Sequence, residues 1–299
     1  MSRADLSFVT LTGFLLAALA CIALGACTPP EQPEQESSRL QGGIVEIGIG
    51  TVETYADTDA DGALSAVGVV FSDGAFDELP DEITDGHRCF DSNGDGEIDP
   101  HAECSAWHER VLPLPSEISR RDDVPFKWVL LNWNNHGHIP PGVWDVPHFD
   151  VHFYIESIEK IFSLQRGDCG PEFLRCDQFE IATRPVPEPY MHADYVDVGA
   201  AAPAMGNHLV DTTAAEFHGE PFTRSWIYGA YDGEVIFYEE MLALNYLRSE
   251  PQDCYPIKTP PTVRLSGYYP ETVCTRHDSE SGSVTVSLEE FTFREAEAI

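Results

Sequence analysis

Short apolar segments separated by Gly, Pro, Asp and Ser recur along this chain and predict a fold built from strands. The clearest is residues 126–133, an apolar and aromatic run typical of a buried strand. Residues 44–55 and 63–72 flank an Asp- and Gly-rich turn at 57–62 and predict a hairpin. Further apolar segments are residues 223–231, 233–238, 272–277 and 284–293.

Helical patterns are few and short in this sequence. They fall at residues 105–111, 157–164 and 239–247. Together with the strand pattern they predict a mainly β fold, an antiparallel barrel- or sandwich-like domain with two or three short helices. We expect residues 43–299 to form this single β-rich domain.

The N-terminal residues have the pattern of an export signal. An apolar run over residues 8–26 ends in Leu24-Gly25-Ala26-Cys27, which resembles the lipobox of a bacterial lipoprotein. The resemblance implies removal of residues 1–26 and a lipid on Cys27, which would anchor the protein in the cell envelope. Thr28 follows the cysteine, so the outer membrane is the expected location. An uncleaved anchor and an ordinary secretory signal are the alternatives.

Residues 27–42 are rich in Pro, Glu and Ser and predict a disordered tether. No later apolar run has the length of a transmembrane helix. We therefore expect membrane contact only through the lipid on Cys27.

Six cysteines remain once Cys21 and Cys27 are assigned to the signal and the lipid site. An even number in an exported chain favours disulfides, and pairing neighbours in sequence closes three short loops. The predicted pairs are Cys89 with Cys104, Cys169 with Cys176, and Cys254 with Cys274. Thiolate metal ligation is the alternative, but the sequence has no Cys-x-x-Cys pair to support it.

The charge balance excludes some partners. The chain has 51 acidic and 17 basic residues, a formal net charge of −34. A body this acidic repels nucleic acid and anionic membrane surfaces, so neither is an expected partner. Adaptation to a salty habitat and binding of cations both account for such acidity.

Four of the eleven histidines fall between residues 136 and 152. Alternate residues of a strand point to opposite faces, so His148, Asp150 and His152 would share one face of a strand. His136 and His138 repeat the same spacing on the preceding segment. Imidazole is the commonest metal ligand and a carboxylate adds an oxygen donor. The pattern favours a transition-metal site, with zinc, iron, manganese and copper not distinguishable.

Two other interpretations of these histidines remain open. Isolated buried histidines are usually hydrogen-bonded core residues, so the cluster is also compatible with a polar structural network. A metal-free catalytic or ligand-binding cluster is the third possibility.

A second motif, between Cys89 and Cys104, resembles a calcium loop of the EF-hand type. Oxygen donors stand at alternate positions around a glycine, as calcium coordination requires. The expected ligands are Asp91, Asn93, Asp95, Glu97 and Asp99. Ala102 replaces the usual bidentate glutamate and Glu103 comes one place late. An acidic surface loop closed by a disulfide is the alternative.

Four sequence motifs resemble those of a family of exported bacterial proteins. These proteins carry a domain of unknown function and are typified by a sigma-E-regulated protein of an extreme thermophile. The motifs are residues 130–138 (LLNWNNHGH), 147–154 (PHFDVHFY), 205–211 (MGNHLVD) and 228–239 (YGAYDGEVIFYE). Glu240 stands where the family has a proline, and residues 81–110, with the calcium-like loop, form an insertion. The resemblance implies a β-rich, barrel-like domain capable of assembling into homo-oligomeric rings, and adds His208 and Glu239 to the candidate metal ligands. It implies no activity.

Two functions are compatible with this sequence, and a calcium-dependent adhesion module built on the 91–99 loop is a third, weaker alternative. One is a metal-binding envelope lipoprotein whose histidine site is catalytic, with an unknown small-molecule substrate. Three protein ligands with an open position would be typical of such a site. The other is a non-enzymatic lipoprotein that binds a ligand or assembles, with the polar cluster as a structural element and calcium stabilising the 91–99 loop.

Overall fold

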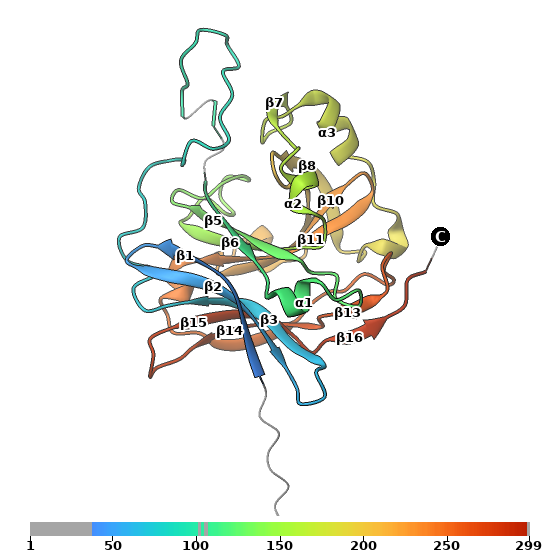
Figure 1. Cartoon of the computed structure of the whole chain (residues 1–299). Helices are drawn as coiled ribbons and strands as arrows, with labels where there is room; N and C mark the ends of the chain where they lie inside the picture. The colour runs from blue at the N-terminus through green and yellow to red at the C-terminus, as the bar shows by residue number, and fades with distance from the viewer. Residues whose placement is uncertain (1–37, 101–102, 105–106, 298–299) are drawn as a thin grey trace, which may run out of the picture. The chain divides into compact units, whose positions relative to one another are not determined.

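Two large antiparallel sheets form the framework of the protein. The structure is a computed structural model, and it describes residues 38–100, 103–104 and 107–297. These belong to the unit Glu36–Ile299. The prediction of a mainly β fold is confirmed (Figure 1). The sheets remain open and face each other, so the arrangement is sandwich-like and not a closed barrel.

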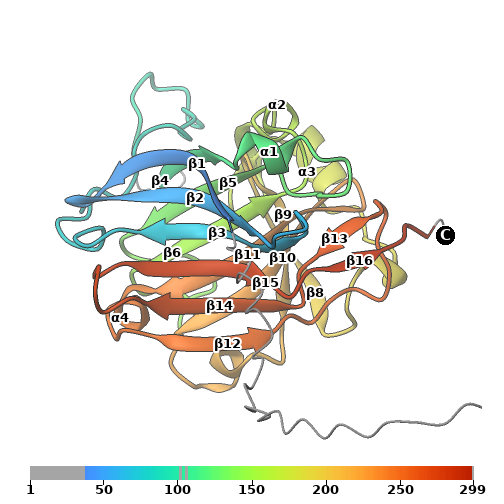
Figure 2. The same cartoon turned by 60° about the horizontal axis from the view of Figure 1, so that its bottom comes forward.

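The first sheet has six strands and faces the viewer in Figure 2. Its order is β1 (Ser38–Ile47), β2 (Gly50–Thr58), β3 (Leu64–Phe71), β15 (Val284–Glu289), β14 (Thr272–His277) and β12 (Gln252–Pro256). A separate pair joins β13 (Gly267–Tyr269) to β16 (Thr292–Arg294).

The second sheet has seven strands and carries the candidate site. Its order is β4 (His108–Pro113), β5 (Trp128–Asn134), β6 (His148–Tyr154), β11 (Glu234–Ala243), β10 (Arg224–Tyr231), β9 (Gly206–Asp211) and β8 (Tyr195–Ala202). The remaining elements are short: β7 (Arg166–Cys169), α1 (Ser116–Ser119), α2 (Ile158–Ile161), α3 (Cys176–Ala182), α4 (Leu244–Leu247), and the 3-10 turns η1 (Glu188–Tyr190) and η2 (Ala215–His218).

The main core lies between the two large sheets. Phe149, Val151 and Phe153 of β6 are fully buried there, and the Phe149 ring lies 5.2 Å from that of Phe71 on β3. Burial of each such side chain stabilises the fold by about 1.5–3 kcal/mol. Because these residues turn one face of β6 toward the first sheet, the residues between them, including Asp150, face the other way.

The strand pattern located most strands, but three segments differ from expectation. The segment 44–55 is two strands, because Gly48 turns the chain with a φ of 57°. Residues 108–113 are strand β4 and not part of a helix, and residues 105–106 lie outside the described part. The helix expected over 239–247 is limited to α4, because β11 pairs with β10 as far as Leu242 and with β6 as far as Ala243.

Residues 38–42, which the sequence assigned to the tether, belong to strand β1. Strand β1 begins at Ser38, within the segment 27–42, and the Arg39 side chain forms an ion pair of 2.7 Å with Asp57 on β2. Residues 1–37, which contain the expected signal and Cys27, lie outside the described residues. No helix among those described is long and apolar enough to cross a membrane.

All three predicted disulfides are present. They join Cys89 to Cys104, Cys169 to Cys176, and Cys254 to Cys274. The second one closes the loop between β7 and α3. Leu174 and Ala182 from this region pack against Ala201 of β8, which places the loop over the outer face of the seven-stranded sheet.

Candidate metal centre

The register of the seven-stranded sheet places polar side chains of four strands on its outer face. His148, Asp150 and His152 alternate along β6 as their spacing predicted. Glu239 of β11 lies directly opposite His152, and Asn132 of β5 lies opposite Asp150. These polar residues are buried, although they face away from the main core.

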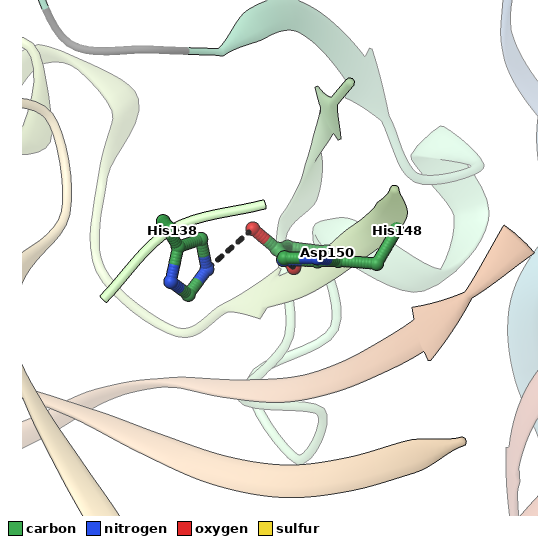
Figure 3. Close-up of side chains that lie close together, drawn as sticks. All are labelled: His138, His148 and Asp150. Atoms are coloured by element: carbon green, nitrogen blue, oxygen red, sulfur yellow. Dashed lines mark ion pairs between the residues drawn. The ribbon is translucent and has the colours of Figure 1, made fainter. Parts of the chain in front are cut away.

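The first group of possible metal ligands is His138, His148 and Asp150 (Figure 3). His138 comes from the loop that follows β5 and meets the two strand residues. Its Nε2 lies 3.5 Å from Asp150 Oδ2, and His148 Nε2 lies 3.1 Å from Asp150 Oδ1. The three side chains therefore converge on one point.

The second group is His152, His208 and Glu239. His152 Nε2 lies 3.4 Å from Glu239 Oε1, and His208 Nε2 lies 3.9 Å from Glu239 Oε2. His208 is on β9, one strand beyond β10, and the residue beside it on β10 is Gly229. A Cβ at Gly229 would come within 2.0 Å of the Phe237 ring, so the glycine makes room for that ring next to both histidines.

The Nδ1 atom of every histidine in both groups contacts a backbone carbonyl. The partners are Ile139 for His138, Val146 for His148, Leu130 for His152 and Ala200 for His208, at 2.7–3.1 Å. A carbonyl only accepts, so each Nδ1 carries the hydrogen, and the Nε2 of the neutral ring has a free lone pair. This arrangement fixes the ring orientation of metal-binding histidines.

With neutral rings and ionised carboxylates, lone pairs of nitrogen and oxygen would face each other in both groups. His148 Nε2, His152 Nε2, Asp150 Oδ1 and Glu239 Oε2 are buried and have no hydrogen-bond partner. Buried polar atoms without partners are costly, on the order of 1–3 kcal/mol each. One cation in each group would satisfy the unpartnered atoms of that group.

Without a cation, protons must offset the charges of the first group. Burial lowers the pKa of His138, but the hydrogen bond and charge of Asp150 outweigh it and raise that pKa to about 9. Burial acts to raise the pKa of Asp150, yet His148 and His138 hold it well below the ordinary range. The metal-free first group is thus an imidazolium–carboxylate pair.

The second group balances its charges differently. Burial lowers the pKa of His152 to about 3 and that of His208 to about 4, so both rings are neutral at pH 7. Burial, with the nearby charges of Asp150 and Glu240, raises the pKa of Glu239 well above its ordinary value. The metal-free second group therefore keeps a proton on Glu239, and a metal ion would replace that proton.

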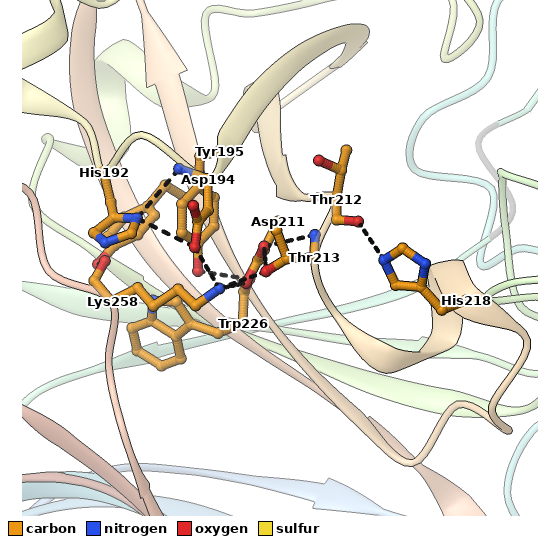
Figure 4. Close-up of polar contacts among 10 residues, drawn as sticks. His192, Asp194, Tyr195, Asp211, Thr212, Thr213, His218, Trp226 and Lys258 are labelled. Carbon is orange, nitrogen blue, oxygen red and sulfur yellow. Dashed lines mark hydrogen bonds and ion pairs between the residues drawn. The ribbon is translucent and has the colours of Figure 1, made fainter.

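Asn134 of β5 and a lysine network support the ligands. Asn134 Nδ2 donates to Asp150 Oδ2 at 2.7 Å, deep in the protein. Lys258 Nζ donates to Asp211 at the end of β9 (2.6 Å) and to Asp194 (2.7 Å), which fixes the end of the strand that carries His208 (Figure 4). These residues are not among the predicted ligands, although Asn132 and Asn134 have the same alternate spacing as the histidines.

Both groups open into one cavity of about 470 Å³. His138, Asp150, His208 and Glu239 line it, whereas His148 and His152 lie behind them. Glu172 also lines this cavity, from the loop closed by the Cys169–Cys176 disulfide. Burial raises the pKa of Glu172 and Asp150 raises it further, against His138 and Arg166. Glu172 was missed in the sequence because it belongs to no spacing motif.

His136 is the one predicted metal ligand that the structure leaves outside both groups. Its side chain is exposed. Strand β5 ends at Asn134 and Gly137 then turns the chain with a φ of 71°, so the alternation expected for His136 and His138 is not continued. His138 reaches the site from a loop and not from a strand.

The calcium-like loop is closed by its own hydrogen bonds. Asp91 accepts N–H bonds from Gly94 and Gly96, at 2.7 and 2.8 Å. Glu103 is buried and accepts N–H bonds from Ser92 and Asp99, at 2.9 and 3.0 Å. The possible metal groups among the described residues do not include Asp91, Asn93, Asp95, Glu97 or Asp99. Calcium binding at this loop stays a prediction.

Comparisons with known proteins identify no relative of this chain. No family model matches it, and searches of curated proteins and of solved structures found no similar protein. The resemblance to a family of exported proteins therefore stays a prediction, and the functional argument depends on the site alone.

Proposed function

We propose that this protein is a metalloprotein of the cell envelope that binds a transition metal ion at each of the two groups and uses them as a catalytic site. Each group supplies two imidazoles and one carboxylate. Such a set is typical of zinc in hydrolytic enzymes and of non-haem iron in oxygenases. A metal ion held there would supply an activated water or a Lewis acid to a molecule in the cavity.

The observation that carries this proposal is the common orientation of the four imidazoles. Every Nδ1–H is donated to a backbone carbonyl, and every Nε2 lies 3.1–3.9 Å from a carboxylate oxygen of its group. A structural network of neutral rings would instead direct N–H donors at the carboxylates, because hydrogen bonds stabilise buried polar groups. Here such a contact needs an added proton, on His138 in the first group and on Glu239 in the second. The backbone thus holds the rings in the orientation that metal binding requires.

The number of ligands favours catalysis over a structural role. Structural zinc sites in proteins are saturated by four protein ligands, whereas catalytic sites keep a position for water or substrate. Each group here has three protein ligands, and members of both line the cavity. Glu172 supplies a carboxyl group on the same cavity that could transfer a proton.

Location in the envelope is part of the proposal. The lipobox-like Leu24-Gly25-Ala26-Cys27 supports export and a lipid anchor. Three disulfides fit the same compartment, because such bonds persist outside the reducing cytoplasm.

Substitution with cobalt(II) tests whether the sites are open. We expect the cobalt-loaded protein to absorb in the visible range and the bands to shift when azide is added, since azide enters a free coordination position. Bands that do not respond to azide would show saturated sites and would favour the alternative, a structural cluster in a non-enzymatic lipoprotein. Cobalt that does not bind at all would contradict the proposal and leave the histidines as a metal-free polar cluster.

A further inference from the structure

The cavity has a polar side, formed by members of the two metal groups, and an apolar wall. Apolar side chains from separate parts of the fold form most of it, among them Trp107, Trp144, Met205, Phe217, Ile227 and Met241. Such a wall gains stability by excluding water, so the cavity favours an occupant with a large apolar surface.

Two tryptophans of this wall have donors without acceptors. Trp107 and Trp144 are only 5% and 4% exposed, and the Nε1 atom of each has no hydrogen-bond partner in the described structure. Buried indole N–H groups normally find an acceptor. Both side chains line the cavity, so a small rotation of either ring would bring its N–H to an oxygen acceptor on a bound molecule.

The charged groups that line the cavity are all acidic or imidazole. Asp150, Glu172 and Glu239 contribute carboxyl groups, and no lysine or arginine lines the cavity among the described residues. The chain as a whole has a formal charge of −34. The one cation, the His138 imidazolium, is already paired with Asp150. No unpaired protein cation among the described lining residues is therefore available to recognise a phosphate or carboxylate, and the surrounding charge repels anions.

From these observations we infer that the cavity binds an uncharged organic molecule with two or three fused or linked rings and at least one hydroxyl or carbonyl oxygen. The volume of about 470 Å³ sets the size, since a cavity on the order of 150 Å³ accommodates one benzene ring. The oxygen accepts from an indole N–H, and the rings pack on the apolar wall. This inference rests on the proposed function for the chemistry at the metal ions, but the binding itself depends only on the wall.

Matched probes separate the contributions of charge and oxygen. The probes are 2-naphthol, 2-naphthoate and naphthalene, which share a ring system and differ in one substituent. We expect titration of the metal-free full-length protein at pH 7, with chelator present and followed by tryptophan fluorescence, to show 2-naphthol binding at least tenfold more tightly than 2-naphthoate. Equal or tighter binding of 2-naphthoate would overturn the inference, as would no binding of 2-naphthol.

Variants locate the bound molecule. Trp144→Phe keeps an aromatic ring but removes the N–H, and we expect it to weaken 2-naphthol about fivefold and to leave naphthalene unchanged. Trp226→Phe is the matched control, because its indole N–H also lacks a partner but lies in the core between the sheets. Met241→Trp fills the cavity and should abolish binding of both. Equal effects of Trp144→Phe and Trp226→Phe would place the ligand elsewhere and contradict the inference.

Metal loading separates this inference from the proposed function. 2-Naphthol binding by a chain that takes up no metal would refute the metal site and leave the inference intact. Metal uptake without 2-naphthol binding would support the metal site and refute the inference on the cavity ligand.

Discussion

His152 of β6 and Glu239 of β11 lie directly opposite each other in the sheet, with Nε2 of the imidazole 3.4 Å from Oε1 of the carboxyl group. Both side chains are almost fully buried. The imidazole donates its Nδ1–H to the carbonyl oxygen of Leu130, so its Nε2 carries no hydrogen. The facing atoms must therefore share either a proton or a metal ion, and the second choice leads to the predictions on metal binding.

Removal of one ligand should reduce metal content selectively. We expect His148→Ala to lose most of the metal bound at the first group, because two remaining ligands hold an ion much less tightly. His277→Ala is the control, since His277 lies on β14, away from both groups, where it faces Glu250. Elemental analysis of the two variants checks this. Equal losses in both would contradict the assignment of His148 as a ligand.

Gly229 should be required for the second group. In Gly229→Ala the new methyl group would meet the Phe237 ring, which packs against His152 and His208 at centroid distances of 4.9 and 5.5 Å. We expect a loss of about 1–3 kcal/mol in the free energy of unfolding, typical of overpacking, and weaker metal binding at this group. Urea denaturation and metal titration measure both.

A compensating change tests the cause of that effect. Phe237→Leu in the Gly229→Ala chain makes room for the methyl group, and we expect it to recover part of the metal affinity. Strict additivity of the two substitutions would show that they do not act through the same contact.

The buried Glu240 should make stability depend on pH. Burial raises its pKa to about 8, against the hydrogen bond from Tyr255. In the unfolded chain this carboxyl ionises near pH 4.5. Between these values the folded state holds a proton that the unfolded state has lost, so stability falls as pH rises from about 4.5 to 8.

Substitution isolates this contribution to stability. We expect Glu240→Gln to gain stability relative to the original chain as pH rises, by roughly 3–5 kcal/mol in total, since one unit of pKa corresponds to about 1.4 kcal/mol. Urea denaturation at pH 5 and pH 8.5, with chelator present, measures it. Glu46→Gln, at an exposed position, is the control. A pH-independent difference for Glu240→Gln would contradict the account.

Glu103 should hold the calcium-like loop closed. Its carboxyl group accepts backbone N–H bonds from Ser92, Asn93 and Asp99. We expect Glu103→Gln to increase cleavage of the 91–99 segment by a nonspecific protease severalfold, because a neutral amide accepts these bonds more weakly. Glu97→Gln, an exposed residue of the same loop, should change it little. If added calcium protects the loop, the predicted calcium ligands gain support, and protection lost in Glu97→Gln would assign one of them.

Local patterns located most of the framework and part of the site. Alternation predicted β6 and the shared face of His148, Asp150 and His152, because one face of that strand must enter the core. Sequence spacing also gave the three disulfides, since each closes a short loop. These features depend on residues close together in the chain.

The rest depends on pairing between distant strands. No local pattern shows that β11 pairs with β6 and so places Glu239 opposite His152. The prediction of a helix over 239–247 was wrong for the same reason. Backbone hydrogen bonds to the strands on both sides of β11 outweigh the local helical preference. Glu172 reaches the cavity only through the fold of its loop, which no spacing reveals.

The most direct test is the elemental content of the full-length protein, purified without a histidine tag or chelator. We predict about two equivalents of a transition metal per chain, falling to about one in both His148→Ala and His208→Ala. A chain that contains no transition metal, and takes up none when incubated with zinc, iron(II), manganese or copper, would contradict the account and leave the histidines as a polar network.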